Sequence, residues 1–385
     1  MDLKNDHNIY ILGAGFSRAA GLPLISDFLV QMRDSHEWLT QQNRTREAES
    51  VAKVMAFRLD AASAAYWVNL DLENIEQLFS LAAATKGDMD RHTRIAIAAT
   101  IDFARQTKPL LPTRLHWQGT SQLFGREGAS KQSLPQHLPG WVQFSDQQST
   151  LVISPYNYYV ARLLGMFRDG KVKGENTFIT FNYDTVLEKA LYDLQVPFSY
   201  WLGEKEVHFQ EDALGKDSPD SVPVLKLHGS TNWGRQIGPG GPLSVHRSSE
   251  EIIGKGYVPE IIPPTWKKLF LRQLETVWER AVQQLNTATR IIVIGFSIPP
   301  TDMHFQYLMA AGLQNNISLR QILFVDPAEP ELLEPRIRHL LREAYFDSGQ
   351  ISIEKTTLEG FTRASGIGKI HTIGRPDEEG TTLRI

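Results

Sequence analysis

Residues 9–23 read IYILGAGFSRAAGLP, an apolar run from Ile9 to Leu12 that enters a loop at Gly13. This order is typical of a strand, a tight turn and the start of a helix. Glycine at positions 13 and 15 lets the backbone turn sharply and approach a pyrophosphate, which the following helix N-terminus favours. Arg18 replaces the third glycine of the G-x-G-x-x-G pattern. Because such turns also need glycine for backbone reasons alone, the motif by itself leaves nucleotide binding open.

Apolar runs alternate with helical patterns beyond residue 176. The predicted strands are 177–181, 222–227, 290–295 and 322–325, and the predicted helices are 183–194, 267–286, one from 302 onward and 329–343. Strands that alternate with helices indicate a parallel sheet with helices on both faces. We therefore expect an α/β fold with a doubly wound, Rossmann-like parallel sheet of about six strands.

The region between the first strand and residue 176 has a different character. Residues 45–107 are predicted to be helical, and residues 109–150 are rich in Pro, Gly, Gln and Ser and predict a long irregular connection. The expected organisation is one α/β domain with an inserted, mostly helical subdomain and a loose C-terminal tail. Its boundaries are 1–35 with 171–363 for the α/β domain, 36–170 for the insertion and 364–385 for the tail.

Composition excludes several classes of protein. The chain has 385 residues, a formal net charge of -4 and no cysteine. Disulfides, thiolate zinc sites and a cysteine nucleophile are therefore impossible. The balanced charge predicts no direct binding to nucleic acid or to an anionic membrane. No signal peptide or membrane span is recognisable, which indicates a cytoplasmic protein.

Polar residues follow two of the predicted strands. Asn182 and Asp184 come after the strand 177–181, where an amide could bind ribose hydroxyls or a water, although both residues could equally cap the next helix. His228 and Gly229 follow the strand 222–227. A histidine there suits a general base, and the alternative is a structural histidine in a turn.

Two more strands end in the same way. Gly295 and Ser297 come at the end of the strand 290–295, after its apolar run IIVI, and Asp326 follows the strand 322–325. An acid at this place often binds ribose in dinucleotide folds, and the alternative is a cap on the helix at 329. The carboxyl ends of parallel strands share one edge of a sheet. These elements and the Gly13 loop are thus predicted to form a single ligand crevice.

The order GAGFSRAAGLP, FNYD, KLHGS, GFS and VD resembles the sirtuin family over residues 8–34 and 176–345. The resemblance implies a sirtuin-type fold that binds NAD as substrate. It implies that Gly13, Ala14, Gly15 and Ser17 face the NAD phosphates.

The resemblance also assigns residues to the reacting end of NAD. Asn182 matches the asparagine on the nicotinamide ribose, Asp184 the acid on the carboxamide, and His228, beside Gly229, the catalytic histidine. Gly295 and Ser297 match the adenosine side. Asp326 stands where sirtuins typically have an asparagine on the adenine ribose.

The sequence departs from deacylase sirtuins at two places. Their four-cysteine zinc module is missing, so no zinc is expected. Asp27 and Phe28 match part of their proline-aspartate-phenylalanine-arginine run, but Leu24, Ile25 and Ser26 intervene and no arginine follows. With these departures, the chain resembles the sirtuin-like effectors of bacterial antiphage systems, which hydrolyse NAD during abortive infection. Some members of that group pair with a HerA-type hexameric ATPase.

We therefore expect an NAD+ glycohydrolase that uses Asn182 and His228. A module that senses NAD or ADP-ribose without turnover is the alternative, and a protein deacylase is less favoured because the zinc module is missing. Trp38, Tyr66 and Trp67 in alanine-rich helices predict a homo-oligomer joined through the insertion, and the alternative is that these side chains face the core.

Overall fold

The computed structural model of the chain describes most of its residues. They are residues 6–65, 67–85, 87–108, 110–116, 143–144, 150–166, 171–203, 207–211, 213–216, 218–236, 241–265, 272–298 and 303–363. Within these ranges no helix is long and apolar enough to cross a membrane. The predicted tail over 364–385, most of the predicted connection over 109–150 and Tyr66 lie outside the described residues.

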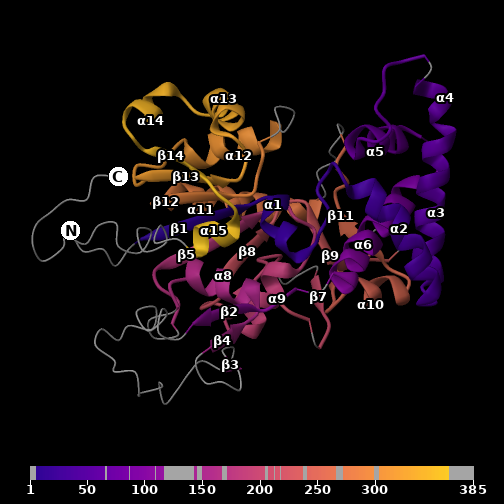
Figure 1. The fold of residues 1–385 in the computed structure, drawn as a ribbon, viewed down its shortest axis with the longest axis horizontal. Helices are drawn as coiled ribbons and strands as arrows, with labels where there is room; N and C mark the ends of the chain where they lie inside the picture. The colour runs from indigo at the N-terminus through magenta and orange to yellow at the C-terminus, as the bar shows by residue number, and fades with distance from the viewer. Residues whose placement is uncertain are drawn as a thin grey trace, which may run out of the picture.

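A sheet of seven parallel strands forms the centre of the molecule, in the order β14-β13-β12-β1-β5-β8-β6 (Figure 1). The strands are β1 (His7–Leu12), β5 (Glu175–Thr180), β6 (Phe198–Ser199), β8 (Val222–Lys226), β12 (Arg290–Ile294), β13 (Gln321–Asp326) and β14 (Ile351–Lys355). Ile9 in β1 pairs with Ile291 on one side and with Thr177 on the other. The sheet is doubly wound about β1, which confirms the predicted α/β class. The outermost strands, β6 and β14, were not expected.

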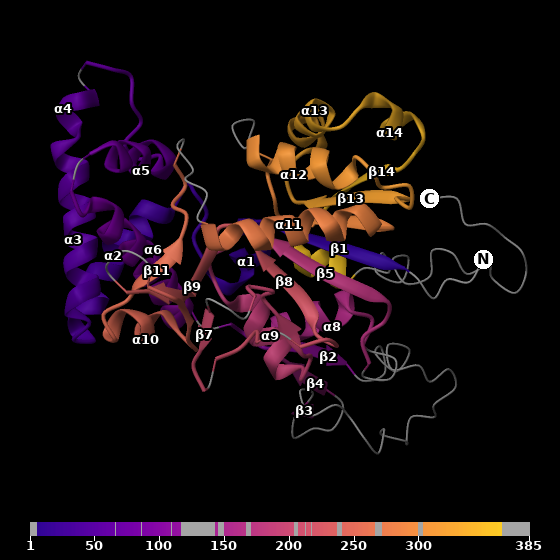
Figure 2. The same ribbon diagram turned by 180° about the vertical axis from the view of Figure 1, so that it is seen from behind.

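Helices cover both faces of this sheet. They are α8 (Pro155–Leu163), α9 (Val186–Asp193), α11 (Arg272–Thr287), α12 (Met303–Leu313), α13 (Pro330–Leu340), α14 (Glu343–Asp347) and α15 (Leu358–Arg363). Helix α15 lies toward the viewer in Figure 1 and α11 toward the viewer in Figure 2, on the opposite face. Helix α11 buries Leu274, Val277, Ala281 and Leu285 completely, as its apolar period predicts.

A group of helices lies at one end of the molecule, beside the sheet (Figures 1 and 2). The group contains α2 (Phe28–Gln41), α3 (Thr45–Asp60), α4 (Ala62–Ala65), α5 (Ile75–Ala84) and α6 (Met89–Thr107). Buried Arg44 connects α3 to α6, since its guanidinium contacts Asp102 at 2.5 Å and Glu47 at 2.9 Å. Helices α3 to α6 follow the helical prediction for residues 45–107, and α2 begins where Ser26 and Asp27 predict the start of a helix, although it extends to Gln41 rather than to about His36.

A second, four-stranded sheet joins the helical group to the parallel sheet, in the order β11-β9-β10-β7. Its strands are β7 (Val207–Phe209), β9 (Gly229–Arg235), β10 (Leu243–Val245) and β11 (Val258–Ile261), with the short helix α10 (Ser249–Gly254) beside them. Residues 236–264, which are rich in glycine and proline, gave no sign of β10 and β11 within them. Strands β7, β10 and β11 have only three or four residues, too few for a clear alternation of apolar and polar residues. Strand β9 has seven residues, but Trp233 is its only large apolar residue.

The segment before β5 differs from its expected form in two ways. Strands β2 (Thr113–His116), β3 (Gln143–Phe144) and β4 (Thr150–Ile153) form a small antiparallel sheet where an irregular connection was predicted. Helix α8 packs against α9 and α15 on the parallel sheet, and the Tyr10 hydroxyl in β1 donates to the Leu163 carbonyl at 2.6 Å. The last part of the predicted insertion over 36–170 thus contributes to the layer of helices on the sheet.

Candidate functional site

The order of the strands reverses at β1. From β1 the chain builds β5, β8 and β6 on one side of the sheet, and later β12, β13 and β14 on the other. In open parallel sheets, ligands bind where such a reversal occurs, at the carboxyl ends of the strands. Gly13 follows β1, Asn182 follows β5, His228 follows β8, Gly295 follows β12 and Asp326 ends β13. The structure thus brings these predicted residues to one edge of the sheet.

The loop after β1 packs backbone to backbone against the loop after β12. Helix α1 (Ala14–Ser17) and a 3-10 turn, η2 (Arg18–Ala20), follow Gly13. Gly13 N–H donates to the Ile294 carbonyl at 3.0 Å, and Gly15 N–H donates to the Gly295 carbonyl at 2.8 Å. A Cβ atom on Gly13 would lie 2.5 Å from the Gly295 carbonyl oxygen. Close packing of the two loops therefore requires glycine at position 13 whether or not a phosphate binds nearby.

Asn182 joins the loop after β5 to the loop after β1. Its side-chain Nδ2 donates to the Gly13 carbonyl at 2.8 Å and contacts the Ser17 hydroxyl at 3.2 Å. Its backbone N–H donates to the Thr180 hydroxyl at 3.0 Å, and Thr180 in turn donates to the Leu12 carbonyl at 3.2 Å. Both amide contacts use Nδ2, so the opposite side of the amide presents the acceptor Oδ1.

His228 lies among aromatic side chains between the same loops. The residue is 7% exposed, and its ring centroid is 5.1 Å from Phe181 and 6.4 Å from Tyr183. Phe181 also stacks on Phe296, with ring centroids 5.0 Å apart. Phe181 thus contacts both His228 and the loop after β12.

Gly229 begins β9 in a conformation that favours glycine. Its φ is +81°, and a Cβ atom would lie 2.0 Å from the Glu260 carbonyl oxygen of β11. On the other side of the same turn, the His228 carbonyl accepts from Ile262 N–H at 2.9 Å. The backbone of the His228 turn is therefore held tightly against β11, which orients the imidazole.

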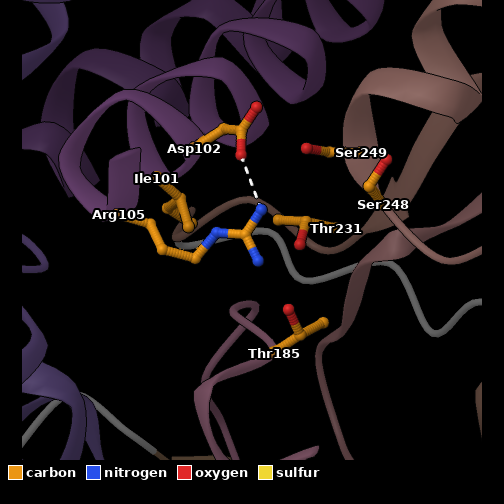
Figure 3. A pocket seen from close by; sticks show the side chains of 7 residues that line it. All are labelled: Ile101, Asp102, Arg105, Thr185, Thr231, Ser248 and Ser249. Atoms are coloured by element: carbon orange, nitrogen blue, oxygen red, sulfur yellow. Dashed lines mark hydrogen bonds and ion pairs between the residues drawn. The ribbon is translucent and has the colours of Figure 1, made fainter. Parts of the chain in front are cut away.

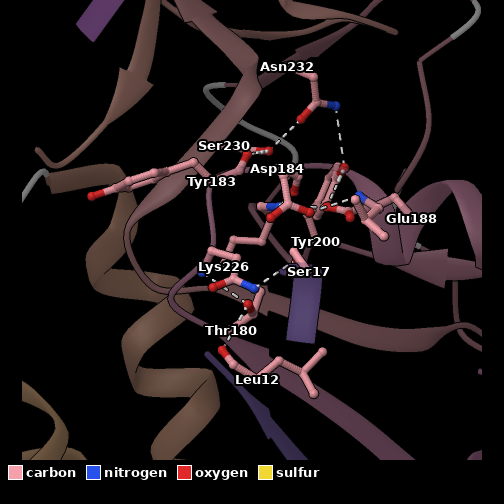
Figure 4. A network of polar contacts seen from close by, with 12 residues as sticks. Leu12, Ser17, Thr180, Tyr183, Asp184, Glu188, Tyr200, Lys226, Ser230 and Asn232 are labelled. Carbon is pink, nitrogen blue, oxygen red and sulfur yellow. Dashed lines mark hydrogen bonds and ion pairs between the residues drawn. The ribbon is translucent and has the colours of Figure 1, made fainter. Parts of the chain in front are cut away.

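A buried ion pair lies next to the loop after β5 and the turn after β8, which carry Asn182 and His228 (Figure 4). The Lys226 ammonium contacts the Glu188 carboxylate at 2.8 Å, with side chains 1% and 2% exposed. Lys226 also donates to the Asp184 backbone carbonyl. Burial raises the pKa of Glu188, and the positive charge of Lys226 opposes this only in part. Lys226 thereby connects β8, two residues before His228, to the loop that carries Asn182.

A series of hydrogen bonds connects this ion pair back to the loop after β5. The Tyr200 hydroxyl donates to Glu188 at 3.3 Å and accepts from Asn232 Nδ2 at 3.3 Å. The Ser230 hydroxyl contacts Asn232 Oδ1 at 2.6 Å and the Tyr183 carbonyl at 3.3 Å (Figure 4). These contacts form a ring, the Lys226–Glu188 network, that begins at the Asp184 carbonyl and ends at the Tyr183 carbonyl.

Asp184 has local partners of its own. The residue is 8% exposed, and its Oδ1 accepts from Val186 N–H at 3.0 Å at the start of α9. The structure thus contains the helix-capping contact that was the alternative for this residue. The Asp184 charge also acts on Tyr156: burial raises the pKa of that phenol, and the nearby carboxylate raises it further.

Tyr156 holds the loop after β1 from the other side. Its hydroxyl donates to the Phe16 carbonyl at 2.6 Å and accepts from Ala20 N–H at 3.2 Å. The raised pKa keeps the phenol protonated, as donation to the Phe16 carbonyl requires. Sequence reasoning missed this tyrosine, because nothing in the local pattern of α8 connects it to a loop some 140 residues earlier.

Asp27 and Phe28 are also engaged within the protein. Asp27 accepts from Arg18 at 2.6 Å and from Leu24 N–H at 2.7 Å. Burial would raise the pKa of Asp27, but hydrogen bonds from Arg18, Leu24 and Gln31 lower it further than burial raises it. Phe28 opens α2 and is 7% exposed, within the core.

The predicted adenosine-side residues lie at the ends of β12 and β13. Gly295 has a φ of +61°, and Ser297 is exposed, with its carbonyl accepting from Arg336 at 2.7 Å. Asp326 accepts from Ala328 N–H at 2.8 Å, which is the capping contact considered above for this acid. Ala14 is exposed at the first position of α1.

The sequence did contain one signal for the Lys226–Glu188 network. Lys226 stands inside the apolar run 222–227, and a lysine buried in a strand needs a charged or polar partner. Its partner Glu188 could not be identified, because the two residues meet only when β8 pairs with β5. Among the described residues, no group of three or more His, Cys, Asp or Glu side chains is placed to hold a metal ion. The expected absence of zinc stays a prediction.

Residues 176–347 match the family model of the SIR2-like domain. This SIR2-like region begins in β5 and ends in α14, so it contains Asn182, His228 and Asp326. The glycine loop after β1 precedes it in the sequence and meets it in space through Asn182 and Gly295. The SIR2-like region therefore supplies five of the seven strands of the parallel sheet, β5, β6, β8, β12 and β13, while β1 and β14 lie outside it.

Comparisons with whole proteins give more distant likenesses. A search of curated proteins found no match to the chain. Among solved structures, a Sir2 homologue–NAD complex aligns with 12% identity and a TM-score of 0.40, over 95% of this chain and 90% of that chain. Sir2 bound to EX-527, 2'-O-acetyl-ADP-ribose and a deacetylated p53 peptide aligns with 12% identity and a TM-score of 0.36, over 94% of each chain. The fold described above rests on strand order and register, not on these low scores.

Proposed function

We propose that the protein is an NAD+ glycohydrolase, which cleaves NAD+ to nicotinamide and ADP-ribose. The observation that carries this proposal is the bridge made by Asn182. Its amide joins the glycine loop to the loop after β5, and Phe181 next to it contacts His228. An amide and an imidazole thus converge at the strand edge beside a loop suited to a pyrophosphate. The match of residues 176–347 to the SIR2-like domain supports the choice of NAD.

The proposed reaction is hydrolysis at C1′ of the nicotinamide ribose. The bond from C1′ to the nicotinamide nitrogen breaks, neutral nicotinamide leaves, and a water oxygen bonds to C1′ as the water loses a proton. The hard step is formation of the oxocarbenium-like ribose. Asn182 Oδ1 would accept from a ribose hydroxyl or orient the water, while Nδ2 remains on Gly13. His228 would accept the proton, with a typical contribution of about 10²–10⁴-fold.

The remaining substrate contacts extend along the same edge. Gly13, Ala14, Gly15 and Ser17 would hold the pyrophosphate at the start of α1. Binding energy from this remote group would fix the reacting ribose. On the reacting side, Asp184 would hold the carboxamide and Gly229 would border the ribose.

At the other end of the crevice, the adenosine half would lie along the ends of β12 and β13. Gly295 and Ser297 would contact the adenosine, and Asp326 would contact its ribose. Asp27 and Phe28 would close the crevice near the glycine loop.

The test is nicotinamide release by wild type, Asn182→Ala and His228→Ala, measured by chromatography. We expect each variant to lose at least about 10²-fold in turnover. Asn182→Ala also removes two hydrogen bonds, for a stability cost of about 1–2 kcal/mol, so assays belong well below its melting temperature. Exposed His208→Ala and Asn315→Ala are matched controls that should keep wild-type turnover. Wild-type turnover in either folded active-site variant would contradict its proposed role.

A sensing module is the second candidate. The specific observation in its favour is that Asn182 Nδ2 and Asp184 Oδ1 already have protein partners. A module of this kind would bind NAD or ADP-ribose in calorimetry and release no nicotinamide in any assembly. A deacylase would instead need an acylated peptide to release nicotinamide.

The resemblance to antiphage effectors extends the proposal to biology and partners. NAD depletion during infection would be the cellular role, and a HerA-type hexameric ATPase would be the partner. Co-expression with such an ATPase, followed by size-exclusion chromatography and an NAD assay in cells, tests both points. Separate elution and unchanged cellular NAD would contradict the partner and the role.

A further inference from the structure

Helix α11 places one tryptophan, Trp278, against the ends of two strands of the candidate site. Its indole Nε1–H donates to the Leu227 carbonyl at 3.0 Å, and Leu227 is the residue before His228. Its ring lies edge to face with Phe181, 6.4 Å between centroids, and Phe181 is the residue before Asn182. One side chain thus contacts the neighbours of both proposed catalytic residues.

The hydrogen bond from Trp278 restrains the peptide group that leads into His228. This peptide is trans, so the Leu227 carbonyl and the His228 nitrogen lie in one plane with both Cα atoms. A donor that holds the carbonyl therefore restricts the backbone from which the imidazole projects. After His228, its own carbonyl accepts from Ile262 N–H at 2.9 Å. Hydrogen bonds thus hold the peptide groups on both sides of the histidine.

The helix that carries Trp278 is firmly anchored. Helix α11 has 16 residues, and its apolar face is completely buried. The indole also lies 5.9 Å from the ring of His304, at the start of α12, which follows the loop after β12. Side chains on a packed helix hold a site more precisely than side chains on loops do. Trp278 therefore relates the ends of β5 and β8 to a rigid element.

The helical group supports the same two segments less directly (Figure 3). Thr185, in the loop before α9, and Thr231, in β9, line a small pocket that Ile101 and Arg105 of α6 line from across. A gap separates α6 from both segments at this point. The direct contacts to the residues before Asn182 and His228 come instead from α11.

We propose that Trp278 is a positioning residue of the candidate site, whose indole N–H holds the His228 turn in the geometry that proton transfer needs. Its catalytic consequence rests on the proposed hydrolysis, whereas the restraint on the turn can be measured without any substrate. The N–H is engaged by the Leu227 carbonyl, so Trp278 acts through the backbone of His228. Loss of this contact should lower kcat and leave NAD binding nearly unchanged.

The first experiment follows hydrogen exchange of the Ile262 amide in the full-length protein by NMR. This amide donates to the His228 carbonyl, so its protection reports how firmly the turn is held. Trp278→Phe removes the N–H and keeps an aromatic ring. We expect about fivefold faster exchange at Ile262, which corresponds to the loss of one typical hydrogen bond. Amides of β12 should keep their wild-type rates, whereas general destabilisation would speed exchange throughout the sheet.

The matched control for this exchange experiment is Trp38→Phe, which makes the same chemical change at another half-buried tryptophan, in α2. It should leave exchange at Ile262 unchanged. Trp278→His keeps a ring and an N–H donor, so it should exchange more slowly at Ile262 than Trp278→Phe does. If Trp278→Phe does not fold, Trp278→His and Trp278→Leu give the same comparison, because only the first of them has a donor.

The second experiment asks whether Trp278 acts through His228. We expect Trp278→Phe to lower kcat for nicotinamide release by about tenfold or more, with KM for NAD changed by less than about twofold. In a His228→Ala background, the same change should have almost no further effect, because the group that it positions is already missing. A tryptophan with a purely structural role would lower kcat by the same factor in both backgrounds.

Equal exchange at Ile262 in wild type and Trp278→Phe would overturn the inference, and so would equal losses of kcat in the two backgrounds. The two experiments also separate this inference from the proposed function. If wild type releases no nicotinamide while Trp278→Phe speeds exchange at Ile262, the restraint on His228 stands and the hydrolysis falls. If His228→Ala abolishes turnover while Trp278→Phe changes neither exchange nor kcat, the hydrolysis stands and the positioning role falls.

Discussion

Gly295 is the residue whose backbone conformation most directly holds the candidate site together. Its φ is +61°, and a Cβ atom there would lie 2.4 Å from Phe16 N. The left-handed conformation alone costs a non-glycine residue about 1–2 kcal/mol. Because the clash is with backbone rather than with a flexible side chain, the loops after β1 and β12 would have to separate.

We expect Gly295→Ala to destabilise the protein by about 3 kcal/mol or more, as the sum of conformational strain and overpacking. Gly349→Ala is the matched control, since Gly349 has a φ of +71° and no atom within 4 Å of the added Cβ. The control should cost only about 1–2 kcal/mol. Equal losses in urea unfolding would show that loop contact at Gly295 contributes nothing.

At the scale of elements, the Lys226–Glu188 network joins β8, α9 and β9. A buried ion pair contributes little net stability compared with apolar residues of similar volume, but removal of one partner leaves an uncompensated charge. We therefore expect Lys226→Met alone to cost about 3–5 kcal/mol, and Lys226→Met/Glu188→Leu to cost much less. Exposed Lys189, paired with Asp193 on the same helix α9, is the control, and Lys189→Met should change stability by about 1 kcal/mol at most.

The same double variant separates positioning from stability. If the network orients the loops of Asn182 and His228, the folded double variant should lose turnover by about tenfold or more while it still binds NAD. Calorimetry with NAD gives binding, and nicotinamide release gives turnover. A stable double variant with wild-type turnover would mean that the network is structural only.

His7 connects elements at the opposite edge of the sheet. Its ring contacts Thr287 at the end of α11 and Thr177 in β5, at 3.0 and 3.1 Å. Burial lowers the pKa of His7 below its ordinary value of 6.5, and the charge of Glu175 opposes this in part. The unfolded chain therefore binds a proton at His7 more readily than the folded chain does.

Stability should consequently be complete above about pH 6.5 and should fall as the pH drops below it. His7→Gln can keep an amide contact to either threonine but does not titrate, so its urea unfolding should depend less on pH between 7.5 and 5. Exposed His208→Gln is the control and should follow wild type. An unchanged pH dependence in His7→Gln would contradict the linkage.

At the scale of the whole molecule, the predicted homo-oligomer would form through the helical group. Trp38 in α2 is half-buried against Phe103 and Arg44, so it is not available to a partner. Trp67 is 83% exposed and Val68 is 59% exposed. Exposed apolar residues gathered at one end of a molecule are typical of interfaces.

We expect wild type to form a homo-oligomer at micromolar concentration and Trp67→Ser to shift it toward the monomer. Multi-angle light scattering after size exclusion measures both. Leu332→Ser is the control, because Leu332 is 62% exposed on α13, at the other end of the molecule. A monomeric wild type, or equal dissociation of both variants, would contradict an interface in the helical group.

The order of apolar runs, helical periods and strand-end motifs in the sequence was enough to determine the parallel α/β fold. Runs such as Ile291–Ile294 are buried on both faces, and this local property is visible without the fold. The same reasoning selected Asn182 and His228, because parallel strands bring their carboxyl ends together. It could not find β7, β10 and β11, which have three or four residues each, or β9, in which Trp233 is the only large apolar residue.

Only the tertiary structure decided which partner each polar residue has. Asp27 contacts Arg18, Lys226 contacts Glu188, and Asn182 reaches Gly13 across 169 positions of sequence. Local sequence restricts backbone conformation and burial, because these depend on neighbours within a few residues. Hydrogen bonds and ion pairs depend on distances of about 3 Å between atoms, and only the packing of the whole chain brings distant residues that close.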